Sequence, residues 1–348
     1  MEVGSEFGNN SNRIGQNEYL QICSFPRKFF LSGRTGLHFI GQEIKNLVSE
    51  IVLPEYCCGS MIAPFAAQGY KISFYNSFDL NNVSVDETEQ AFLILDYFGF
   101  LSDATLTFIS KCKAAGKIVI VDATQTAFSH SKTYDLADYI VASYRKWFDC
   151  LCAVVFSKNG FNSAERIKEH TSYTRTWRKA AGLKENYLKG SPVDKNGFLD
   201  LFAQANHQLD IDCVDYTPDD TELVMLCEAD SSFLRKRRRE NAAYLMSAVK
   251  KLSTFSEVQL IFDIMRNDDC PLFVPILVNE NKRNVIRSVL IKNNIYCPIH
   301  WPIDQRYPYC ISQYHKREIS LICDQRYGID EMKKQVTVLS QALILADD

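Results

Sequence analysis

A lysine and a carboxylate each follow an apolar stretch of this sequence. Lys146 comes shortly after the run Tyr139–Ala142, and Asp122 ends the run Lys117–Asp122. Apolar runs of this length predict buried strands, so each side chain is expected where a strand ends. In open α/β sheets, ligands bind at the carboxyl ends of the strands. We therefore expect Lys146 and Asp122 to face one binding site.

The chemistry that needs such a pair is that of pyridoxal phosphate (PLP). A PLP enzyme forms an imine with a lysine, and partial burial of Lys146 helps its amine to give up a proton. A carboxylate such as Asp122 keeps the pyridine nitrogen protonated, which makes the ring an electron sink. Taken singly, either residue is common in α/β proteins without any catalytic role. The pair predicts PLP as the cofactor.

Two places in the sequence are candidates for binding a phosphate. Ser143 and Arg145 lie close to the lysine, and the segment 31–48 begins with a Ser, Gly and Thr turn that continues as an amphipathic helix. The first turn of a helix offers free backbone N–H groups to an anion. An ordinary N-cap formed by Ser32 or Thr35 predicts the same pattern without a ligand. The sequence has no Walker pattern and no GxGxxG, which argues against a nicotinamide-dependent oxidoreductase.

Five segments of the chain resemble the DegT-type aminotransferases of fold type I, many of which act on nucleotide-linked keto-sugars. They are Ser32–Leu37, Leu53–Cys57, Asp122–Gln125, Ser143–Trp147 and Ser320–Tyr327. The matches run in order from about residue 30 to residue 345, which is nearly the whole chain. The resemblance implies an α/β fold-type I PLP transferase, with a mostly parallel sheet in a large domain and a smaller C-terminal α+β domain.

The resemblance also implies a role for each matched residue. At the cofactor these are Lys146 for covalent attachment, Asp122 under the ring nitrogen, Gln125 near the ring hydroxyl, Ser143 with Gly33, Arg34 and Thr35 at the phosphate, and Tyr56 as a flat residue over the ring. For Tyr56, simple packing is the alternative.

Two residues are candidates for the substrate side. Arg326 resembles the C-terminal-domain arginine that binds the carboxylate of an amino donor, and a surface salt bridge is the alternative. His300 is a candidate proton carrier, because the ordinary pKa of histidine lies near neutral pH. A structural histidine is the alternative for this position.

One departure from the family pattern follows the lysine. Members of the family typically have a glycine-rich turn there, whereas residues 147–153 contain no glycine. A backbone position that needs a positive φ would be strained in such a run. A catalytically impaired protein that keeps the fold and the cofactor therefore remains an alternative to an active enzyme.

Composition excludes several classes of protein. The 348 residues are 46% hydrophobic with a net charge of −3, and the pI is near 6.1. An acidic chain of this kind has no general attraction to nucleic acid, and we interpret the basic run Arg235–Arg239 as a solvated helical face. No apolar stretch is long enough to cross a bilayer. The six histidines show no metal-ligand spacing, so no metal is expected.

The order of elements predicts two domains after a flexible tail. The tail is expected at residues 1–17, the large PLP-binding domain at 18–230 and the small domain at 231–348. Strands are expected at Glu50–Leu53, Lys71–Tyr75, Ala91–Tyr97, Lys117–Asp122, Tyr139–Ser143 and Ala153–Ser157 and, in the small domain, near Leu272–Val278, Tyr296–His300 and Ile319–Cys323, with a closing helix at Asp330–Leu345.

Assembly and location are expected from two further patterns. Residues 159–220 are polar yet carry aromatic side chains. In this fold such a segment commonly joins a homodimer interface and the neighbouring active site, and solvated loops would show the same pattern. The twelve cysteines are scattered and the N-terminus has no apolar signal segment, so we expect reduced thiols in a cytoplasmic protein.

These patterns together predict a PLP-dependent aminotransferase. It would move an amino group from an amino-acid donor to a keto or aldehyde acceptor, with a nucleotide-linked keto-sugar as one candidate acceptor. The same residues also support elimination, racemisation or decarboxylation, because these reactions begin from a related carbanion.

Overall fold

The computed structural model describes most of the chain. The described residues are 2–8, 13–21, 23–85, 91–162, 168–169, 171–211, 216–254, 257–307 and 312–347.

The apolar runs of the first half of the chain form one large sheet. Among the described residues it holds seven strands in the order β2-β8-β7-β6-β5-β3-β4. Neighbouring strands are parallel, except that β8 runs antiparallel to both β2 and β7. The bounds are β2 (Arg27–Phe30), β3 (Glu50–Pro54), β4 (Lys71–Tyr75), β5 (Ala91–Ile94), β6 (Ile118–Asp122), β7 (Tyr139–Ser143) and β8 (Ala153–Ser157).

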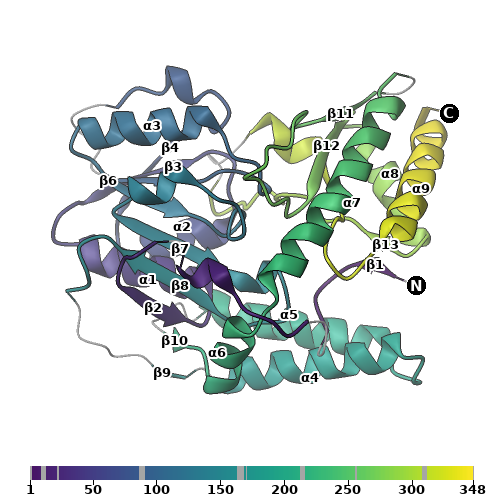
Figure 1. The fold of residues 1–348 in the computed structure, drawn as a ribbon, viewed down its shortest axis with the longest axis horizontal. Coiled ribbons are helices and arrows are strands. Elements are labelled where there is room, and N and C mark those ends of the chain that lie inside the picture. The colour runs from purple at the N-terminus through teal and green to yellow at the C-terminus, as the bar shows by residue number, and fades with distance from the viewer. Residues whose placement is uncertain are drawn as a thin grey trace.

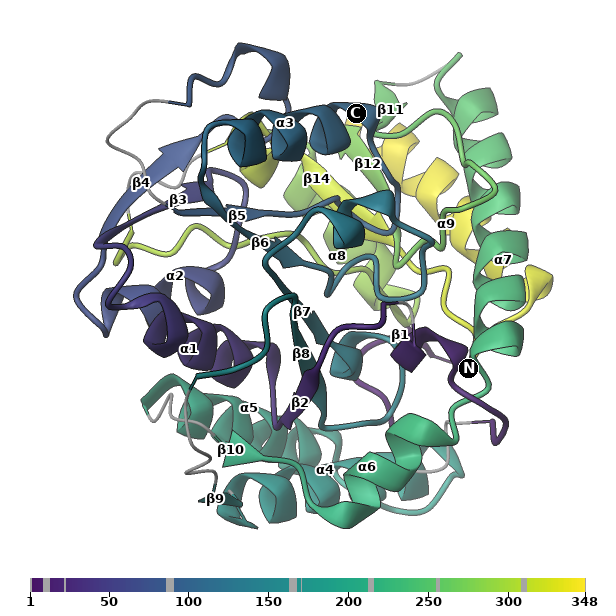
Figure 2. The ribbon, with the colours of Figure 1, turned by 60° about the vertical axis from the view of Figure 1, so that its left-hand side comes forward.

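Both faces of this sheet are covered, which explains why its central strands are apolar throughout. Helix α3 (Asp103–Ala114) lies on one face, and helices α1 (Gly33–Ile44) and α2 (Gly59–Ala66) lie on the other (Figures 1 and 2). Along β6, Val119 and Val121 pack in the cluster that contains α3, and Ile120 packs in the cluster that contains α1.

The second half of the chain forms a smaller antiparallel sheet with helices beside it. The bounds are α7 (Ser231–Leu252), β11 (Val258–Leu260), β12 (Val274–Val278), α8 (Arg283–Lys292), β13 (Ile295–Tyr296), β14 (Glu318–Leu321) and α9 (Ile329–Asp347). The strand order is β11-β12-β14, and the long helices α7 and α9 lie side by side (Figure 1). Apolar residues of this part join the core cluster of the α1 face, so the two parts share one core.

Most of the polar segment 159–220 is a helical hairpin. Its elements are β9 (Lys168–Glu169), α4 (Thr171–Leu188), α5 (Lys195–Ile211) and β10 (Tyr216–Thr217), and α6 (Asp220–Cys227) follows. The aromatic residues that we expected at an interface pack within their own chain. Trp177 of α4 is 2% exposed, and its ring meets that of Phe202 on α5 at a centroid distance of 4.7 Å.

The described part of the predicted tail lies against the folded body. Strand β1 (Val3–Gly4) pairs with β13, and the amide of Gly15 donates to the carbonyl of Glu228 at 2.7 Å. Residue 1 and residues 9–12 fall outside the described ranges. The domain boundaries at residues 17 and 230 stay predictions.

The strand predictions for the large sheet are confirmed as β3 to β8, with small differences at the ends. The prediction missed β2, whose first residues Arg27 and Lys28 are charged. It also extended β13 too far, because Pro298 has no N–H with which to continue a ladder.

Short 3₁₀ turns connect several elements, namely Glu18–Gln21, Leu80–Asn82, Lys132–Asp135, Tyr144–Lys146 and Gln313–Lys316.

The basic run on α7 is not a solvated face, which corrects our interpretation. Arg238 is 1% exposed, and Arg235 donates to the carbonyl of Phe128 at 2.8 Å. Arg239 donates to the carbonyl of Asp269 at 2.6 Å. Three of the five basic side chains are therefore bound to the protein's own backbone or buried within it.

Candidate active site

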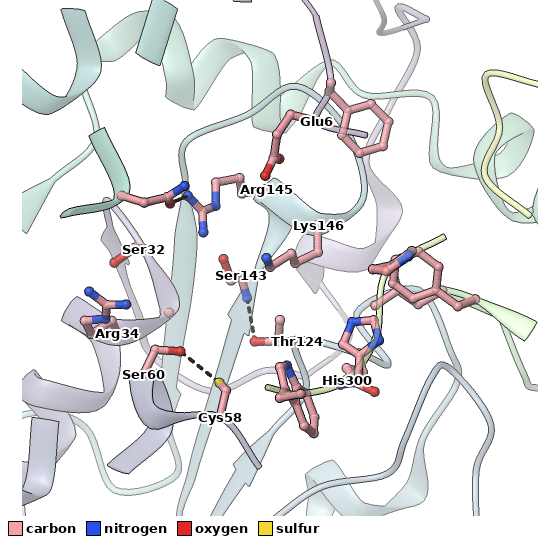
Figure 3. A pocket seen from close by; sticks show the side chains of 18 of the residues that line it. Glu6, Ser32, Arg34, Cys58, Ser60, Thr124, Ser143, Arg145, Lys146 and His300 are labelled. Atoms are coloured by element: carbon pink, nitrogen blue, oxygen red, sulfur yellow. Dashed lines mark hydrogen bonds between the residues drawn. The ribbon is translucent and has the colours of Figure 1, made fainter. Parts of the chain in front are cut away.

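A cavity of about 570 Å³ lies at the carboxyl ends of β6 and β7. Its walls come from the first turn of α1, from α5, from loops of the C-terminal part and from residues 5–7 (Figure 3). The predicted site residues that line it are Gly33, Arg34, Asp122, Gln125, Ser143, Lys146, His300 and Arg326. The structure therefore brings together residues that are far apart in the sequence.

Lys146 ends the 3₁₀ turn that directly follows β7, and its side chain faces the cavity (Figure 3). The positive charge of the neighbouring Arg145 lowers the pKa of this amine, and burial lowers it further. Both effects disfavour the ammonium form. The amine is therefore closer to its neutral, nucleophilic state than a solvated lysine would be.

Asp122 ends β6, and its carboxyl group is buried in the cavity wall. Burial raises the pKa of this group, while the backbone amide of Thr124, at 2.8 Å, favours its charged form. A cationic group placed against Asp122 would favour the carboxylate. The site is thus suited to hold a proton on a basic nitrogen.

Thr124 connects the ends of the two strands. Its hydroxyl accepts a hydrogen bond from the amide of Ser143 at 3.1 Å, and its carbonyl accepts one from the indole of Trp147 at 2.7 Å. These contacts fix Asp122 and Lys146 relative to each other. Gln125 also lines the cavity, and its side-chain oxygen accepts from the amide of Phe98 at 2.5 Å.

The C-terminal part of the chain also holds the backbone next to Lys146. The carbonyl of Trp147 accepts hydrogen bonds from Arg238 at 3.2 Å and from the amide nitrogen of Gln325 at 2.6 Å. Arg238 also donates to the side-chain oxygen of Gln325 at 2.8 Å. None of the residues 147–153 has a positive φ, so the glycine-free run is built without the strain that we considered.

One side of the cavity is suited to an anion. Gly33 begins α1, and a Cβ atom at this position would lie 3.2 Å from the Cβ of Ser143, so the helix start and the end of β7 are in close contact. Arg34 pairs with Asp210 at 2.6 Å. The hydroxyl of Thr35 donates to the carbonyl of Ser32 at 2.7 Å, so this side chain caps the helix and lies off the cavity walls.

Arg145 belongs to the same side of the cavity. Its guanidinium donates to Asn206 of α5 at 2.8 Å and to the hydroxyl of Tyr173 at 3.2 Å, and it lies 4.8 Å from the ring centre of Trp177. With Arg34, the start of α1 and Ser143, it gives this side a positive potential suited to a phosphate.

The two substrate candidates reach the cavity from the C-terminal part. His300 contacts the hydroxyl of Ser320 at 2.9 Å through Nδ1, and its backbone amide donates to Glu318 at 2.6 Å. Arg326 forms a two-pronged pair with Asp324 at 3.0 and 2.7 Å. Both side chains are therefore held in place by partners of their own chain.

Tyr56 does not reach the cavity walls. It is fully buried among aromatic rings, including Tyr97 at 5.4 Å and Trp301 at 5.1 Å between ring centres. Its hydroxyl donates to the carbonyl of His300. The structure therefore agrees with the alternative that we gave for Tyr56, which was packing in the core.

Sequence reasoning missed several residues that line the cavity. They are Ser5, Glu6, Phe7, Cys58, Ser60, Met61, Leu199, Phe202, Ala203, Asn206, Leu209, Arg238 and Asp324, among others. Little in the sequence marks residues 5–7, because the strand before them has only two residues. The amphipathic pattern of α5 was the one available signal for its contribution.

Two other classes of site were searched for among the described residues. No group of three or more His, Cys, Asp or Glu side chains there is arranged to hold a metal ion. In the same residues, no helix combines the length and apolar character needed to span a membrane.

Solved structures of other proteins match the fold of this chain. No protein-family model and no curated protein matches this sequence. Spr1654 of Streptococcus pneumoniae, a putative sugar aminotransferase in its PLP form, has a TM-score of 0.68 at 11% identity, with 99% of this chain and 100% of that chain covered. PseC of Helicobacter pylori, an aminotransferase involved in the biosynthesis of pseudoaminic acid, has a TM-score of 0.64 at 12% identity, with 99% and 100% covered.

A third match is NtdA of Bacillus subtilis with the bound cofactor PMP. Its TM-score is 0.65 at 14% identity, with 95% of this chain and 78% of that chain covered. This chain has their fold. The predicted fold class, a fold-type I architecture with a mostly parallel large sheet and a smaller C-terminal part, is confirmed.

The charge of Arg145 provides a test of the site's electrostatics. Arg145→Gln should raise the pKa of Lys146, because a positive neighbour is removed. The pH dependence of Lys146 labelling by an amine-directed reagent, followed by mass spectrometry of the cofactor-free protein, measures this value. Arg34→Gln is the matched control and should give a smaller rise, because Arg34 contributes less to the lowering. An unchanged labelling profile in Arg145→Gln would contradict the expectation.

Proposed function

We propose that this protein is a PLP-dependent aminotransferase that moves an amino group from an amino-acid donor to a keto or aldehyde acceptor. The observation that carries the proposal is that Lys146 and Asp122 line one cavity at the ends of neighbouring strands. A sugar-linked acceptor, such as a nucleotide-linked keto-sugar, is supported by the likeness to a putative sugar aminotransferase and to an aminotransferase of pseudoaminic acid biosynthesis.

The residues of the cavity fit PLP. The start of α1, Ser143 and Arg145 provide donors and positive charge for the phosphate. Asp122 provides a buried carboxylate for the pyridine nitrogen, and Lys146 provides an amine with a lowered pKa. Bound there, PLP would supply an electron sink for negative charge at the substrate carbon.

The chain's own side chains then have separate tasks. Lys146 would attach the cofactor, and its amine would move a proton at the substrate carbon. Asp122 would hold the proton on the ring nitrogen. Phe202 and Leu209 of α5 are apolar parts of the wall and exclude water from this region.

The alternatives differ in the observation that would favour them. Elimination, racemisation and decarboxylation need the same Lys146 and Asp122. We favour transamination because Spr1654 and PseC, two of the similar structures, are described as aminotransferases. A catalytically impaired relative was suggested by the glycine-free run, and the lack of positive φ in residues 147–153 removes that reason.

We also propose that the protein acts as a cytoplasmic homodimer. No disulfide joins the described cysteines, in keeping with a reducing compartment. Leu188 and Leu199 of the α4–α5 hairpin are 52% and 40% exposed, and a second copy could cover them. The hairpin already lines the cavity of its own chain, so a partner would add to this site and would not have to supply the hairpin's part of the wall.

Sedimentation velocity tests the homodimer. The particle should have about twice the mass of the 39.8 kDa chain at the concentration of an activity assay. Leu199→Asp should shift the population toward the monomer, because it places a charge in the expected interface. A fully active protein that sediments as a monomer would refute this part of the proposal.

Covalent trapping tests the cofactor and its lysine. Protein incubated with PLP should develop a visible absorbance that borohydride removes, and mass spectrometry should find the reduced adduct on Lys146. Lys146→Ala should lose the adduct and lose turnover below detection. Lys184→Ala should keep the adduct, although burial lowers the pKa of Lys184 to about 8. An adduct on any other lysine in the wild-type protein would overturn the assignment.

Substitution of Asp122 tests the electron sink. Asp122→Asn keeps the shape of the side chain but removes the charge that holds the ring proton. The reaction with an amino donor, followed by the decay of the visible band, should slow by about 10²-fold or more, while PLP still binds. Asp96→Asn is the matched control, since Asp96 is a buried carboxyl just beyond β5 and off the cavity walls. A near-normal rate in Asp122→Asn would show that Asp122 is structural.

A further inference from the structure

Residues 2–8, here called the N-terminal strap, cross one side of the cavity, and Ser5, Glu6 and Phe7 line it. The strap begins on the C-terminal part of the chain. Val3 is fully buried and pairs with Ile295 of β13, and the amide of Gly4 donates to the hydroxyl of Tyr327 at 2.9 Å. These contacts fix the backbone two residues before Glu6.

The strap is also held from the α4–α5 hairpin. Glu2 pairs with Lys195 of α5 at 2.5 Å, and Lys184 of α4 donates to the carbonyl of Glu6. Phe7 is 8% exposed, and the guanidinium of Arg326 lies 4.0 Å from the centre of its ring. The strap is therefore pinned on both sides, with Glu6 between the two anchors.

The side chain of Glu6 points into the cavity on the side of Arg145 and Lys146 (Figure 3). Its carboxylate opposes the effect of Arg145 and favours the charged form of Lys146. This wall of the cavity thus carries a negative charge next to the amine that we propose as catalytic. That charge also acts on any substrate placed there.

The strap also changes what Arg326 can do. We expected its guanidinium to bind the carboxylate of an amino donor, but four of its donor contacts lie within the protein. Two go to Asp324, one goes to the carbonyl of Ser5 at 3.1 Å and one to the carbonyl of Glu6 at 3.2 Å. A substrate carboxylate at this place would compete with these partners and face the charge of Glu6.

We propose that Glu6 determines which substrates the cavity accepts. Its carboxylate favours a substrate whose group next to Glu6 donates hydrogen bonds, such as the hydroxyls or the ammonium group of a sugar. It disfavours a carboxylate at that place, so the carboxylate of an amino-acid donor must bind elsewhere in the cavity. This inference rests on the proposed function for the identity of the reaction. The binding preference that it predicts can be measured without turnover.

The test is the affinity of the protein for two unreactive or slowly reacting probes. Succinate serves as the carboxylate probe and glucosamine as the hydrogen-bond donor, each titrated by calorimetry at low ionic strength into the full-length protein loaded with PLP. Glu6→Gln keeps the size of the side chain and removes its charge. We expect the dissociation constant of succinate to fall by about tenfold in this variant, because the repulsion is lost. The affinity for glucosamine should be weaker in this variant than in the wild type.

Glu18→Gln is the matched control, because Glu18 is an exposed carboxylate that lies off both the strap and the cavity walls. It should leave the dissociation constant of succinate within about twofold of the wild-type value. Equal tightening in both variants, or no tightening in Glu6→Gln, would overturn the proposal. If no PLP adduct forms at Lys146, the proposed function fails, and the same titration of the cofactor-free protein still decides the role of Glu6.

Discussion

The hydrogen bonds to the carbonyl oxygen of Trp147 join the two parts of the chain around the cavity. Arg238 and Gln325 both donate to this atom, and Arg238 donates in addition to the carbonyl of Leu272 at 2.9 Å. A buried guanidinium that lost these acceptors would leave an unsatisfied charge in the core, which is strongly destabilising. The position of Arg238 therefore constrains the backbone directly after Lys146, and the lysine in turn depends on the docking of α7.

The geometry of the candidate site follows from this contact and from Thr124. Trp147 is held from one side by the C-terminal part and from the other by its indole bond to Thr124. Thr124 also forms hydrogen bonds with Asp122 and Ser143, so one network of hydrogen bonds reaches the lysine, the carboxylate and the side of the cavity that is suited to an anion. The same network holds Trp147, the first residue of the glycine-free run 147–153.

The part of the site that the sequence predicts is the part that local pattern determines. Asp122 and Lys146 follow strands whose apolar runs are evident in the sequence, and their place at the strand ends follows from the sheet. Glu6, Arg238 and Tyr56 were missed or misplaced because they contact residues that are far away in the sequence. The carbonyl of Glu6 meets Arg326 across 320 positions of the chain, and the hydroxyl of Tyr56 meets His300 across 244. Apolar or charged character alone does not show whether such a residue faces a core, a cavity or solvent.

The contacts at Trp147 also join residues that are synthesised at different times. Its two hydrogen-bond donors lie 91 and 178 positions farther along the chain. The strands of the large sheet and Lys146 thus leave the ribosome before Arg238 and Gln325. A domain can fold while the rest of the chain is still being made. Until residue 325 has emerged, the carbonyl of Trp147 lacks one of its two hydrogen-bond donors from the C-terminal part. The cavity around the lysine is complete only after Arg326, which lines it, has been synthesised.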